Sequence, residues 1–331
     1  MTNPPNKPQP SLVNSDWAAV PDVHRFAHQA MATTFEIVVQ HQDKLYAQQA
    51  AHAAFDELDR IEGELSRYIE NSDVARINTL AAGRPLSLGI DTFACLELSQ
   101  KVHRQTEGAF DVTVGFLLDC WLDDDKQPRN PSPEELRTAR ARTGMSLMRL
   151  DRNRFTVELF SSPVRVDLGG IGKGYGVDQM AELLREWDVD RALIHGGFSS
   201  VLALDAPDGL AGWPITLSDP NDRTRTLVRL QLQRQAVSGS GLQKGQHIID
   251  PRRAQPIEGK TASWSVTPTA ALGDALSTAF MIMTPDQVEK YCAAHPGIRA
   301  LLIVPTADQT QRIITAGPWK PQELVYQEDD S

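Results

Sequence analysis

The feature that most constrains this chain is a glycine-rich stretch at residues 164–178, which reads VRVDLGGIGKGYGVD. Its first four residues predict a strand, and residues 174–188 predict an amphipathic helix. Glycine lets a backbone approach another group closely, and free N–H groups at a helix N-terminus favour an anion. Lys173 adds a charge suited to phosphate oxygens. The stretch therefore predicts a phosphate-binding turn or a tight strand-to-helix connection, and the spacing alone does not choose between them.

Two familiar nucleotide-binding patterns do not fit the stretch. Gly174 stands where a Walker A loop has the Ser or Thr that binds magnesium. The glycines alternate as G-x-G-x-G-x-G, which differs from the G-x-G-x-x-G fingerprint of dinucleotide-binding folds. The spacing therefore argues against a hydride-transferring enzyme of the Rossmann type.

A second informative segment, residues 267–283, reads TPTAALGDALSTAFMIM. Asp274 and Thr278 are four residues apart, so a helix predicted over residues 269–284 places them on one face. A carboxylate beside a hydroxyl offers hard oxygen ligands suited to Mg²⁺. The alternative is a helix-stabilising Asp and a Thr that hydrogen-bonds to its own backbone. Without further context, the residues alone favour this structural alternative.

Two histidines lie beside flexible-looking sequence. His247 and Asp250 flank two apolar residues after a Ser- and Gly-rich segment, residues 238–245, which predicts a flexible loop. His195 precedes Gly196 and Gly197 and is interpreted as a strand-end residue rather than a catalyst.

Composition excludes several classes of protein. The chain carries 33 Lys and Arg against 43 Asp and Glu, a formal net charge of −10, which opposes non-specific binding of nucleic acid. Its three cysteines are widely spaced and form no C-x-x-C pair, which argues against a zinc site and a disulfide framework. No apolar run reaches the roughly 18 residues of a membrane span, and no secretory signal is recognised at the start. We therefore expect a cytoplasmic protein.

Strands and helices alternate without a strict βαβ rhythm, which predicts an α+β fold, with two lobes possible in one domain. We expect a flexible, proline-rich arm at residues 1–27, the domain at 28–318 and a polar tail at 319–331. The further predicted helices cover residues 44–70, 91–107, 133–142 and 285–294. The further predicted strands cover residues 33–40, 155–159, 192–194, 201–204, 215–217 and 227–232.

Three segments, DLGGIGKGYGVD, HIIDPR and DALSTA, resemble the main motifs of the ApbE-type FAD:protein FMN transferases, in the same order and with similar spacing. Weaker matches at residues 30–37, 65–68 and 107–115 extend the resemblance to about residues 28–305. It implies an ApbE-like catalytic domain with mixed or antiparallel sheets and packed helices. It also implies an enzyme that transfers FMN from FAD to a Thr or Ser hydroxyl of an acceptor protein and releases AMP.

The resemblance implies a site for Mg²⁺ and FAD. In that family the metal is held by positions that match Asp274, Thr278 and a main-chain oxygen of Gly172, and Lys173 would face the pyrophosphate. His247 is the candidate base for the acceptor hydroxyl and could equally contact phosphate, and Asp250 would orient it or cap the turn. The remaining residues expected to bind FAD are Met31, Thr33, Tyr68, Asp111, Thr113, Asp167, Gly196 and Gly197.

Three features depart from the family pattern. Ala32 and Phe198 replace a usual glycine and a usual Asn or Asp, and no export leader is recognised. Two alternatives to the transferase remain. They are an FAD pyrophosphatase, which would use water in place of the protein hydroxyl, and a non-catalytic FAD-binding module.

Overall fold

The computed structural model describes residues 13–15, 20, 22–123, 127–161, 163–222, 225–242, 247–306 and 311–324. Most of the expected arm at 1–27, the end of the expected loop at 238–245 and most of the tail at 319–331 lie outside the described residues. Within them, no helix is both long and apolar enough to cross a bilayer.

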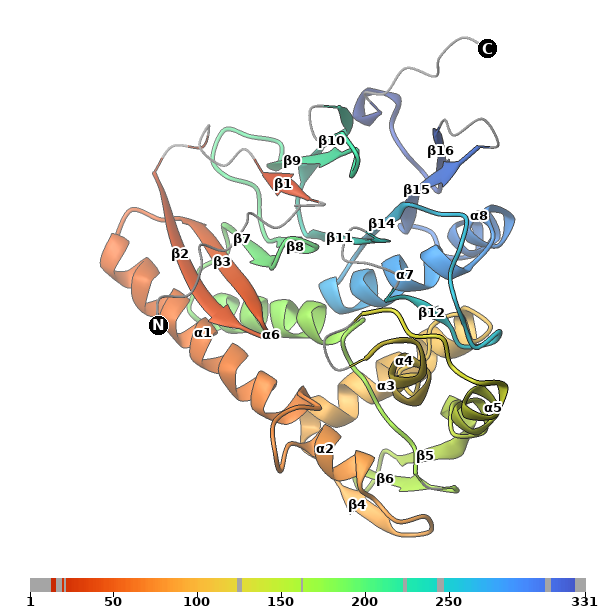
Figure 1. Ribbon diagram of the computed structural model, residues 1–331. Coiled ribbons are helices and arrows are strands. Elements are labelled where there is room, and N and C mark those ends of the chain that lie inside the picture. Colours follow the sequence, from red (N-terminus) through yellow and green to blue (C-terminus); the bar gives the residue numbers. More distant parts are fainter. Residues whose placement is uncertain are drawn as a thin grey trace, which may run out of the picture.

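An eight-stranded sheet forms the centre of the molecule (Figure 1), and every neighbouring pair of its strands is antiparallel. Its order is β16-β15-β14-β11-β8-β7-β3-β2. The strands are β2 (Val23–Ala30), β3 (Thr33–Gln40), β7 (Ala192–Gly196), β8 (Ser200–Ala203), β11 (Gln235–Gly241), β14 (Ala262–Thr267), β15 (Arg299–Pro305) and β16 (Gln311–Ala316).

Three helices cover one face of this sheet: α1 (Lys44–Leu65), α6 (Gly172–Glu186) and α7 (Ala270–Ile282). The alternation of side chains in β3 explains the layering. Phe35 and Ile37 pack with α1 and α6, whereas Val38 points to the opposite core. Strand periodicity thus lets one segment join two hydrophobic cores.

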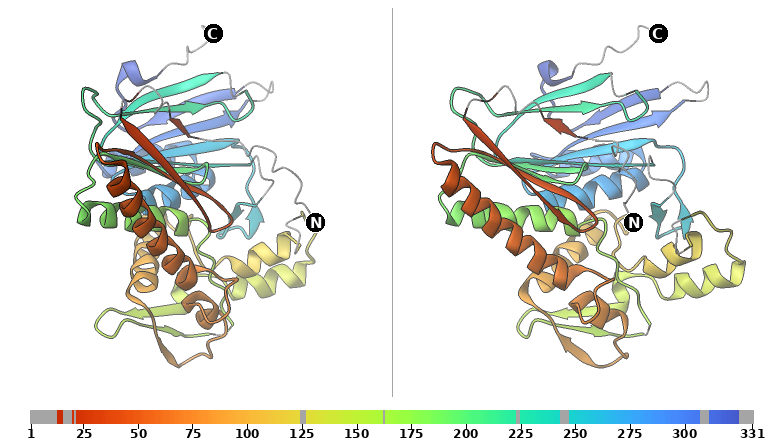
Figure 2. Two further views of the ribbon diagram at one scale, coloured as in Figure 1. Left: turned by 90° about the vertical axis from the view of Figure 1, so that its left-hand side faces the viewer. Right: turned by 60° about the vertical axis from the view of Figure 1, so that its left-hand side comes forward.

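A small sheet covers the other face. Strands β1 (Asn14–Ser15), β9 (Trp213–Ser218) and β10 (Thr226–Leu232) pair in the order β1-β9-β10. Trp213 and Trp264 are fully buried between the two sheets. The result is a layer of helices, a large sheet and a small sheet (Figure 2).

A second part lies below the helices in Figure 1. Its three-stranded sheet has the order β4-β6-β5, and a core cluster runs without interruption from it to α7 and β15. Its elements are α2 (Asp73–Asn78), β4 (Pro85–Ser87), α3 (Ile90–Gln105), α4 (Gly115–Trp121), α5 (Pro133–Ala141), η2 (Met145–Leu147), β5 (Met148–Asp151) and β6 (Thr156–Leu159). The remaining elements are β12 (Ile249–Asp250), β13 (Gln255–Pro256), α8 (Pro285–Ala294) and η4 (Pro321–Glu323).

The α+β class with antiparallel sheets is confirmed, and every predicted helix is present, although α1 ends at Leu65 rather than residue 70. The predicted strand at 164–167 is wrong. Only Arg165 makes an isolated bridge, to Val114, and the segment crosses between the two parts of the molecule as extended chain. Its apolar side chains are buried in the shared core, so burial rather than strand pairing explains the apolar pattern.

The flexible loop predicted at 238–245 is also wrong at its start, because residues 238–241 belong to β11 in the middle of the sheet. Small side chains there allow α7 to pack closely. A Cβ on Gly273 of that helix would stand 2.7 Å from the Oγ of Ser238. The Ser and Gly content therefore reflects close packing of a helix on a strand.

Ordered structure extends beyond residues 28 and 318. Residues 23–27 belong to β2, which pairs along its whole length with β3. At the other end, the Trp319 Nε1 donates to the carbonyl of Ala300 at 3.1 Å, and Glu323 forms an ion pair of 2.7 Å with Arg299. Both expected boundaries therefore cut through paired structure.

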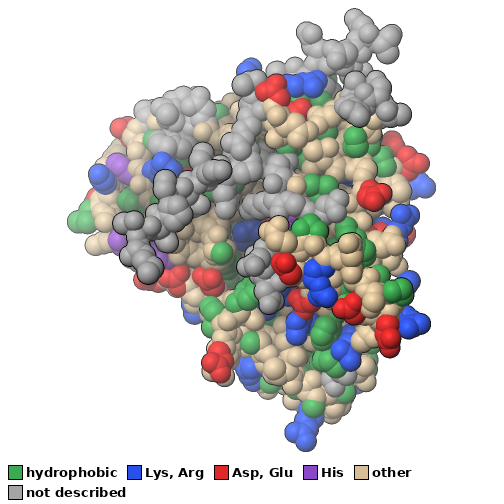
Figure 3. All heavy atoms as spheres, viewed as in Figure 1, with side chains coloured by type: hydrophobic (Ala, Val, Ile, Leu, Met, Phe, Trp, Pro, Cys, Tyr) green, Lys and Arg blue, Asp and Glu red, His purple; other side chains and the backbone are tan. Residues whose placement is uncertain are grey.

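Charged side chains of both signs are interspersed on the lower part of the face seen in Figure 3. The excess of acidic residues is thus not gathered into one acidic region there.

Candidate active site

The glycine-rich turn enters α6 two residues earlier than the sequence predicts. The Asp167 Oδ1 accepts from the Gly169 N at 2.7 Å and shapes the turn, and α6 begins at Gly172. Lys173 therefore lies in the first helical turn, where its Nζ donates to the Gly169 carbonyl at 3.3 Å. This places a positive charge at a helix N-terminus, a combination suited to an anion.

Asp274 of α7 meets this turn directly. Its carboxylate is buried, and its Oδ2 accepts from the Gly174 N at 2.7 Å while its Oδ1 accepts from the Ser200 hydroxyl. Burial raises the pKa of Asp274, whereas the nearby charge of Lys173 lowers it. One N–H of the glycine-rich turn is thus committed to Asp274, which links two motifs 100 residues apart.

The hydroxyl of Ser238 borders the same carboxylate and, as a hydrogen-bonding group, lowers the pKa of Asp274. The Ser238 Oγ is buried, and its alignment does not give a regular hydrogen bond with any described residue. A bound ligand, ion or water would complete the hydrogen bonding of such a group.

Thr278 lies one helical turn beyond Asp274, as predicted. Its Oγ1 is 3.3 Å from the Ser240 Oγ, and a Cβ on Gly170 would stand 3.4 Å from it. Asp274 therefore borders Gly174 and Thr278 borders Gly170, with Gly172 between these two glycines in the chain. The structure thus brings Asp274 and Thr278 together beside the glycine-rich turn, which contains the third position predicted to bind metal, Gly172.

The donor set fits a hard cation. It comprises one carboxylate, one hydroxyl and a main-chain oxygen, and no group of three or more His, Cys, Asp or Glu suited to a metal occurs among the described residues. Mg²⁺ commonly takes one or two carboxylates and completes its shell with waters and phosphate oxygens. These residues could hold Mg²⁺ together with a phosphate-bearing ligand.

The β2–β3 hairpin brings Met31 and Thr33 to this site. Its two-residue turn, Met31–Ala32, has φ values of 48° and 57°, the left-handed conformation of a type I′ turn. A Cβ on Gly176 would stand 3.4 Å from the Met31 Cε, and one on Gly197 would stand 2.8 Å from the Thr33 Oγ1. The hairpin tip therefore packs on both α6 and the β7–β8 turn.

The β7–β8 turn lies against the start of α6. A Cβ on Gly196 would stand 3.6 Å from the Lys173 carbonyl, and Gly197 has a φ of 68°. Phe198, which follows in the turn, is 37% exposed.

His195 lies within β7, where its Nε2 is 3.0 Å from the Ser15 Oγ and burial lowers its pKa to about 4. The interpretation of His195 as a strand residue is confirmed.

The segment that carries His247 packs against the C-terminal half of α7, where Ile248 and Ile257 contact Met281. Asp250 accepts from the Arg252 N at 2.9 Å and from its Nε at 3.0 Å. These bonds favour the role of Asp250 as a cap of the turn. His247 is half-buried at the start of this segment.

Two of the residues expected to bind FAD make internal bonds. The Asp111 Oδ1 accepts from the N and Oγ1 of Thr113 at 2.8 and 2.6 Å, and the same Oγ1 accepts from the Gly144 N at 2.6 Å. Both side chains are buried. They hold the chain between α3 and α4 against the start of η2, so any contact with FAD would come in addition to this role.

Tyr68 and Asp167 are connected through Arg67. The Arg67 guanidinium lies 4.9 Å from the ring centroid of Tyr68, and its Nε is 3.2 Å from the Asp167 Oδ2. Tyr68 is 73% exposed, so this ring stands beside the entrance to the glycine-rich turn and is open to a ligand.

Sequence reasoning missed several polar residues of the site. Ser200, Ser238 and Ser240 surround Asp274 and Thr278, but serines on strands carry no pattern that distinguishes them. Asp178 accepts from the first two N–H groups of α7. Its place at the end of the glycine-rich motif was the only available signal.

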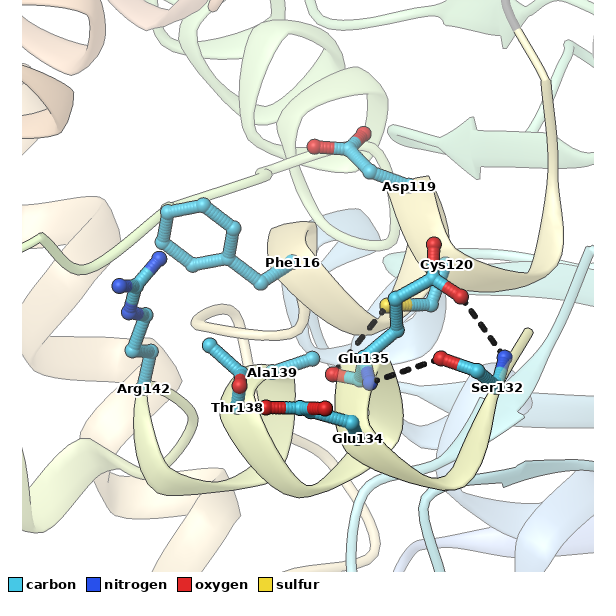
Figure 4. A pocket seen from close by; sticks show the side chains of 9 residues that line it. All are labelled: Phe116, Asp119, Cys120, Ser132, Glu134, Glu135, Thr138, Ala139 and Arg142. Carbon is cyan, nitrogen blue, oxygen red and sulfur yellow. Dashed lines mark hydrogen bonds between the residues drawn. The ribbon is translucent and has the colours of Figure 1, made fainter.

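A separate hollow of about 420 Å³ lies between α4 and α5 (Figure 4) and contains none of the predicted site residues. Ser132 and Glu135 on its wall form the capping box that starts α5, and the Arg142 guanidinium lies over the Phe116 ring at 5.3 Å. These groups are already engaged in local structure, and the phosphate and metal chemistry described above lies elsewhere.

The fold and the site define an α+β protein in which a lysine-bearing helix N-terminus meets a buried carboxylate and a hydroxyl. Residues 31–302 match the model of the ApbE family, and the chain belongs to this family. The family resemblance read from the sequence is therefore confirmed.

Curated relatives named FAD:protein FMN transferase include proteins from Klebsiella pneumoniae and Vibrio cholerae. Each is 27% identical to this chain; the matches cover 83% and 84% of this chain and 82% and 86% of the relatives. Solved structures agree. The flavin transferase ApbE from Vibrio cholerae has 25% identity and a TM-score of 0.77, and the match covers 89% of this chain and 97% of that one. The apo form of the Pseudomonas stutzeri flavinyl transferase ApbE has 26% identity and the same TM-score, with 89% and 94% covered.

Proposed function

We propose that this protein is a Mg²⁺-dependent FAD:protein FMN transferase that modifies a Thr or Ser hydroxyl of an acceptor protein. The observation that carries the proposal is the contact between the Asp274 carboxylate and the Gly174 N–H, with Thr278 beside the same turn. This contact places a helix N-terminus that is suited to phosphate next to two side-chain oxygens that are suited to a cation. Membership of the ApbE family and the names of the relatives support the same activity.

The metal, the pyrophosphate and the flavin would each contact different residues of the site. Asp274, Thr278 and the Gly172 carbonyl would hold Mg²⁺, which supplies charge neutralisation for a pyrophosphate. Lys173 binds the same anion from the start of α6. Met31 and Thr33, at the hairpin tip, line the flavin side of the site.

The reaction requires one proton transfer. The acceptor oxygen attacks the phosphorus that carries the riboflavin, a new P–O bond forms, and the P–O bond to AMP breaks. The hydroxyl proton passes to a base, for which His247 is the candidate because imidazole is the side chain that most often serves as a general base near neutral pH. A role for His247 in contacting phosphate is the alternative.

The decisive experiment incubates the protein with FAD, Mg²⁺ and a candidate acceptor domain, followed by intact-mass analysis of the acceptor and quantification of AMP. A mass increase of one FMN group together with AMP supports the proposal. AMP and free FMN without modified acceptor, across acceptors that a known flavin transferase does modify, would instead identify an FAD pyrophosphatase. Retention of FAD without either product would identify a binding module.

A further inference from the structure

Asp178 connects the two helices of the site at a point away from the predicted ligands. Its carboxylate oxygens accept from the Ala270 N at 2.7 Å and the Ala271 N at 2.9 Å. These N–H groups belong to the first turn of α7, where a helix offers no partners of its own. A residue of α6 thus caps the helix that carries Asp274 and Thr278.

The same helix end has a second, local cap. Thr269 precedes α7, and its Oγ1 accepts from the Leu272 N at 3.4 Å. Thr269 therefore serves only the start of α7, whereas Asp178 also attaches that start to α6. Substitution of Thr269 therefore tests the stability of the helix end, whereas substitution of Asp178 also tests its attachment to α6.

The contacts between the two segments follow a fixed register. Gly170 borders Thr278, Gly174 bonds to Asp274, and Asp178 bonds to Ala270. Each step of four residues along the first segment matches a step of four back along α7, so the two run antiparallel. Asp178 makes the last contact of the row.

This register determines how the cation oxygens face each other. The Gly172 carbonyl belongs to the first segment, while Asp274 and Thr278 belong to α7, so a shift of one helix along the other separates the ligands. One turn of a helix is about 5.4 Å, far more than a coordination shell tolerates. At the crossing, a Cβ on Gly174 would stand 2.8 Å from the Ala271 N, so the backbones are already in close contact.

We propose that Asp178 is a positioning residue of the metal site: by clamping the start of α7 to α6, it fixes the register in which Gly172, Asp274 and Thr278 face a divalent cation. The inference rests on the metal site of the proposed function. Both carboxylate oxygens of Asp178 accept from N–H groups of α7, so its proposed role is to position the metal ligands rather than to be one of them.

The test compares Asp178→Asn with Thr269→Ala in the full chain. The Asn side chain keeps the shape but turns one acceptor into a donor that faces a backbone N–H. Thr269→Ala removes the local cap, a change that typically costs about 1 kcal/mol, and leaves the link to α6 in place. Mn²⁺ binding is titrated with and without FAD by electron paramagnetic resonance, and the Mg²⁺ dependence of AMP release and the thermal unfolding temperature are measured in parallel.

We expect Asp178→Asn to weaken Mn²⁺ binding at least tenfold and to raise the half-saturating Mg²⁺ concentration by a similar factor, with much of kcat recovered at saturating metal. Thr269→Ala should bind Mn²⁺ within twofold of the wild type, even if its unfolding temperature falls as much as that of Asp178→Asn.

Two outcomes overturn the role of Asp178: unchanged Mn²⁺ binding in Asp178→Asn, or an equal loss in Thr269→Ala. Absence of Mn²⁺ binding by the wild type, with and without FAD, overturns the metal site along with it. A wild type that binds Mn²⁺ but neither modifies an acceptor nor releases AMP refutes the proposed function alone, because the Mn²⁺ comparison still decides the role of Asp178.

Discussion

The Oδ2 of Asp274 and the main-chain N of Gly174 are joined by a hydrogen bond of 2.7 Å across 100 residues of sequence. This bond has two consequences. It brings a carboxylate to the start of a lysine-bearing helix, and it requires the backbones of α6 and α7 to approach closely. Both the chemistry of the site and the packing of its helices depend on this pair.

Gly174→Ala should disrupt the crossing of the two helices. The new Cβ would overlap the Ala270 carbonyl and stand 2.8 Å from the Ala271 N, and backbone atoms cannot move aside as a flexible side chain can. We expect a loss of at least about 2 kcal/mol in the free energy of unfolding, measured by urea denaturation.

Gly63→Ala is the matched control for that variant. Gly63 lies inside α1, and a Cβ there meets nothing within 4 Å. Alanine favours a helix over glycine by about 1 kcal/mol, so this variant should be more stable than the wild type. A Gly174→Ala protein of wild-type stability would contradict the close crossing.

Asp274→Asn should abolish Mg²⁺-dependent turnover. The amide keeps the size of the side chain and removes the charge, and stabilisation of charge by a bound metal is worth several kcal/mol. We expect AMP release from FAD to fall by at least about a hundredfold, since each 1.4 kcal/mol changes a rate about tenfold. Ser200→Ala, which removes only one hydrogen bond to Asp274, should have a smaller effect. Full activity of Asp274→Asn would refute the metal assignment.

His247→Ala separates the two roles considered for this residue. Loss of a general base typically lowers a rate by about 10²- to 10⁴-fold, so we expect kcat to fall while the affinity for FAD is kept. Single-turnover rates and equilibrium titration with FAD measure the two quantities separately. Weaker FAD binding with an unchanged rate would make His247 a phosphate-binding residue instead.

His195 should make the fold sensitive to acid. Burial lowers its pKa to about 4 in the folded protein, so the unfolded chain, with a pKa of about 6.5, binds the proton more tightly. The contribution of His195 to the free energy of unfolding is therefore fully present above a pH of about 6.5. It is lost as the pH falls toward about 4, by roughly 3 kcal/mol in total. Urea unfolding from pH 4 to 7 measures this slope. His195→Gln should show a shallower slope, and an identical pH profile would contradict the prediction.

Ala32→Gly should stabilise the β2–β3 hairpin. Ala32 has a φ of 57°, a conformation that costs a residue with a Cβ about 1–2 kcal/mol. Glycine removes this cost but adds freedom to the unfolded chain, which leaves a net gain of about 0.5–1 kcal/mol. The exposed Ala27 of β2 gives the opposite control, because Ala27→Gly should be destabilising. Denaturant midpoints of both variants test the difference in sign.

Much of the fold could be predicted because local sequence patterns indicate most of its helices and strands. The helices follow from apolar residues at helical spacing, as in α1, where Ala51, Phe55 and Leu58 are all buried. Strands with β-branched residues, such as β3, were equally clear. The pattern failed at β11, where Ser and Gly suggest a loop but a central strand needs small side chains beneath α7.

The apolar residues at 164–167 led to the wrong prediction of a strand. Val164 and Val166 are buried, but in a connecting segment that joins the two parts of the molecule. Periodicity reports burial, and burial does not reveal whether a segment has a neighbouring strand to pair with.

The sequence by itself determined that the chain has a glycine-rich turn with Lys173 and that Asp274 and Thr278 share one face of a helix. Their spacing within single elements is a local property. Only the tertiary structure decided that Gly174 meets Asp274 and that Asp178 bonds to the start of α7, because contacts between helices distant in the chain arise from packing in the shared core. No local pattern encodes that contact.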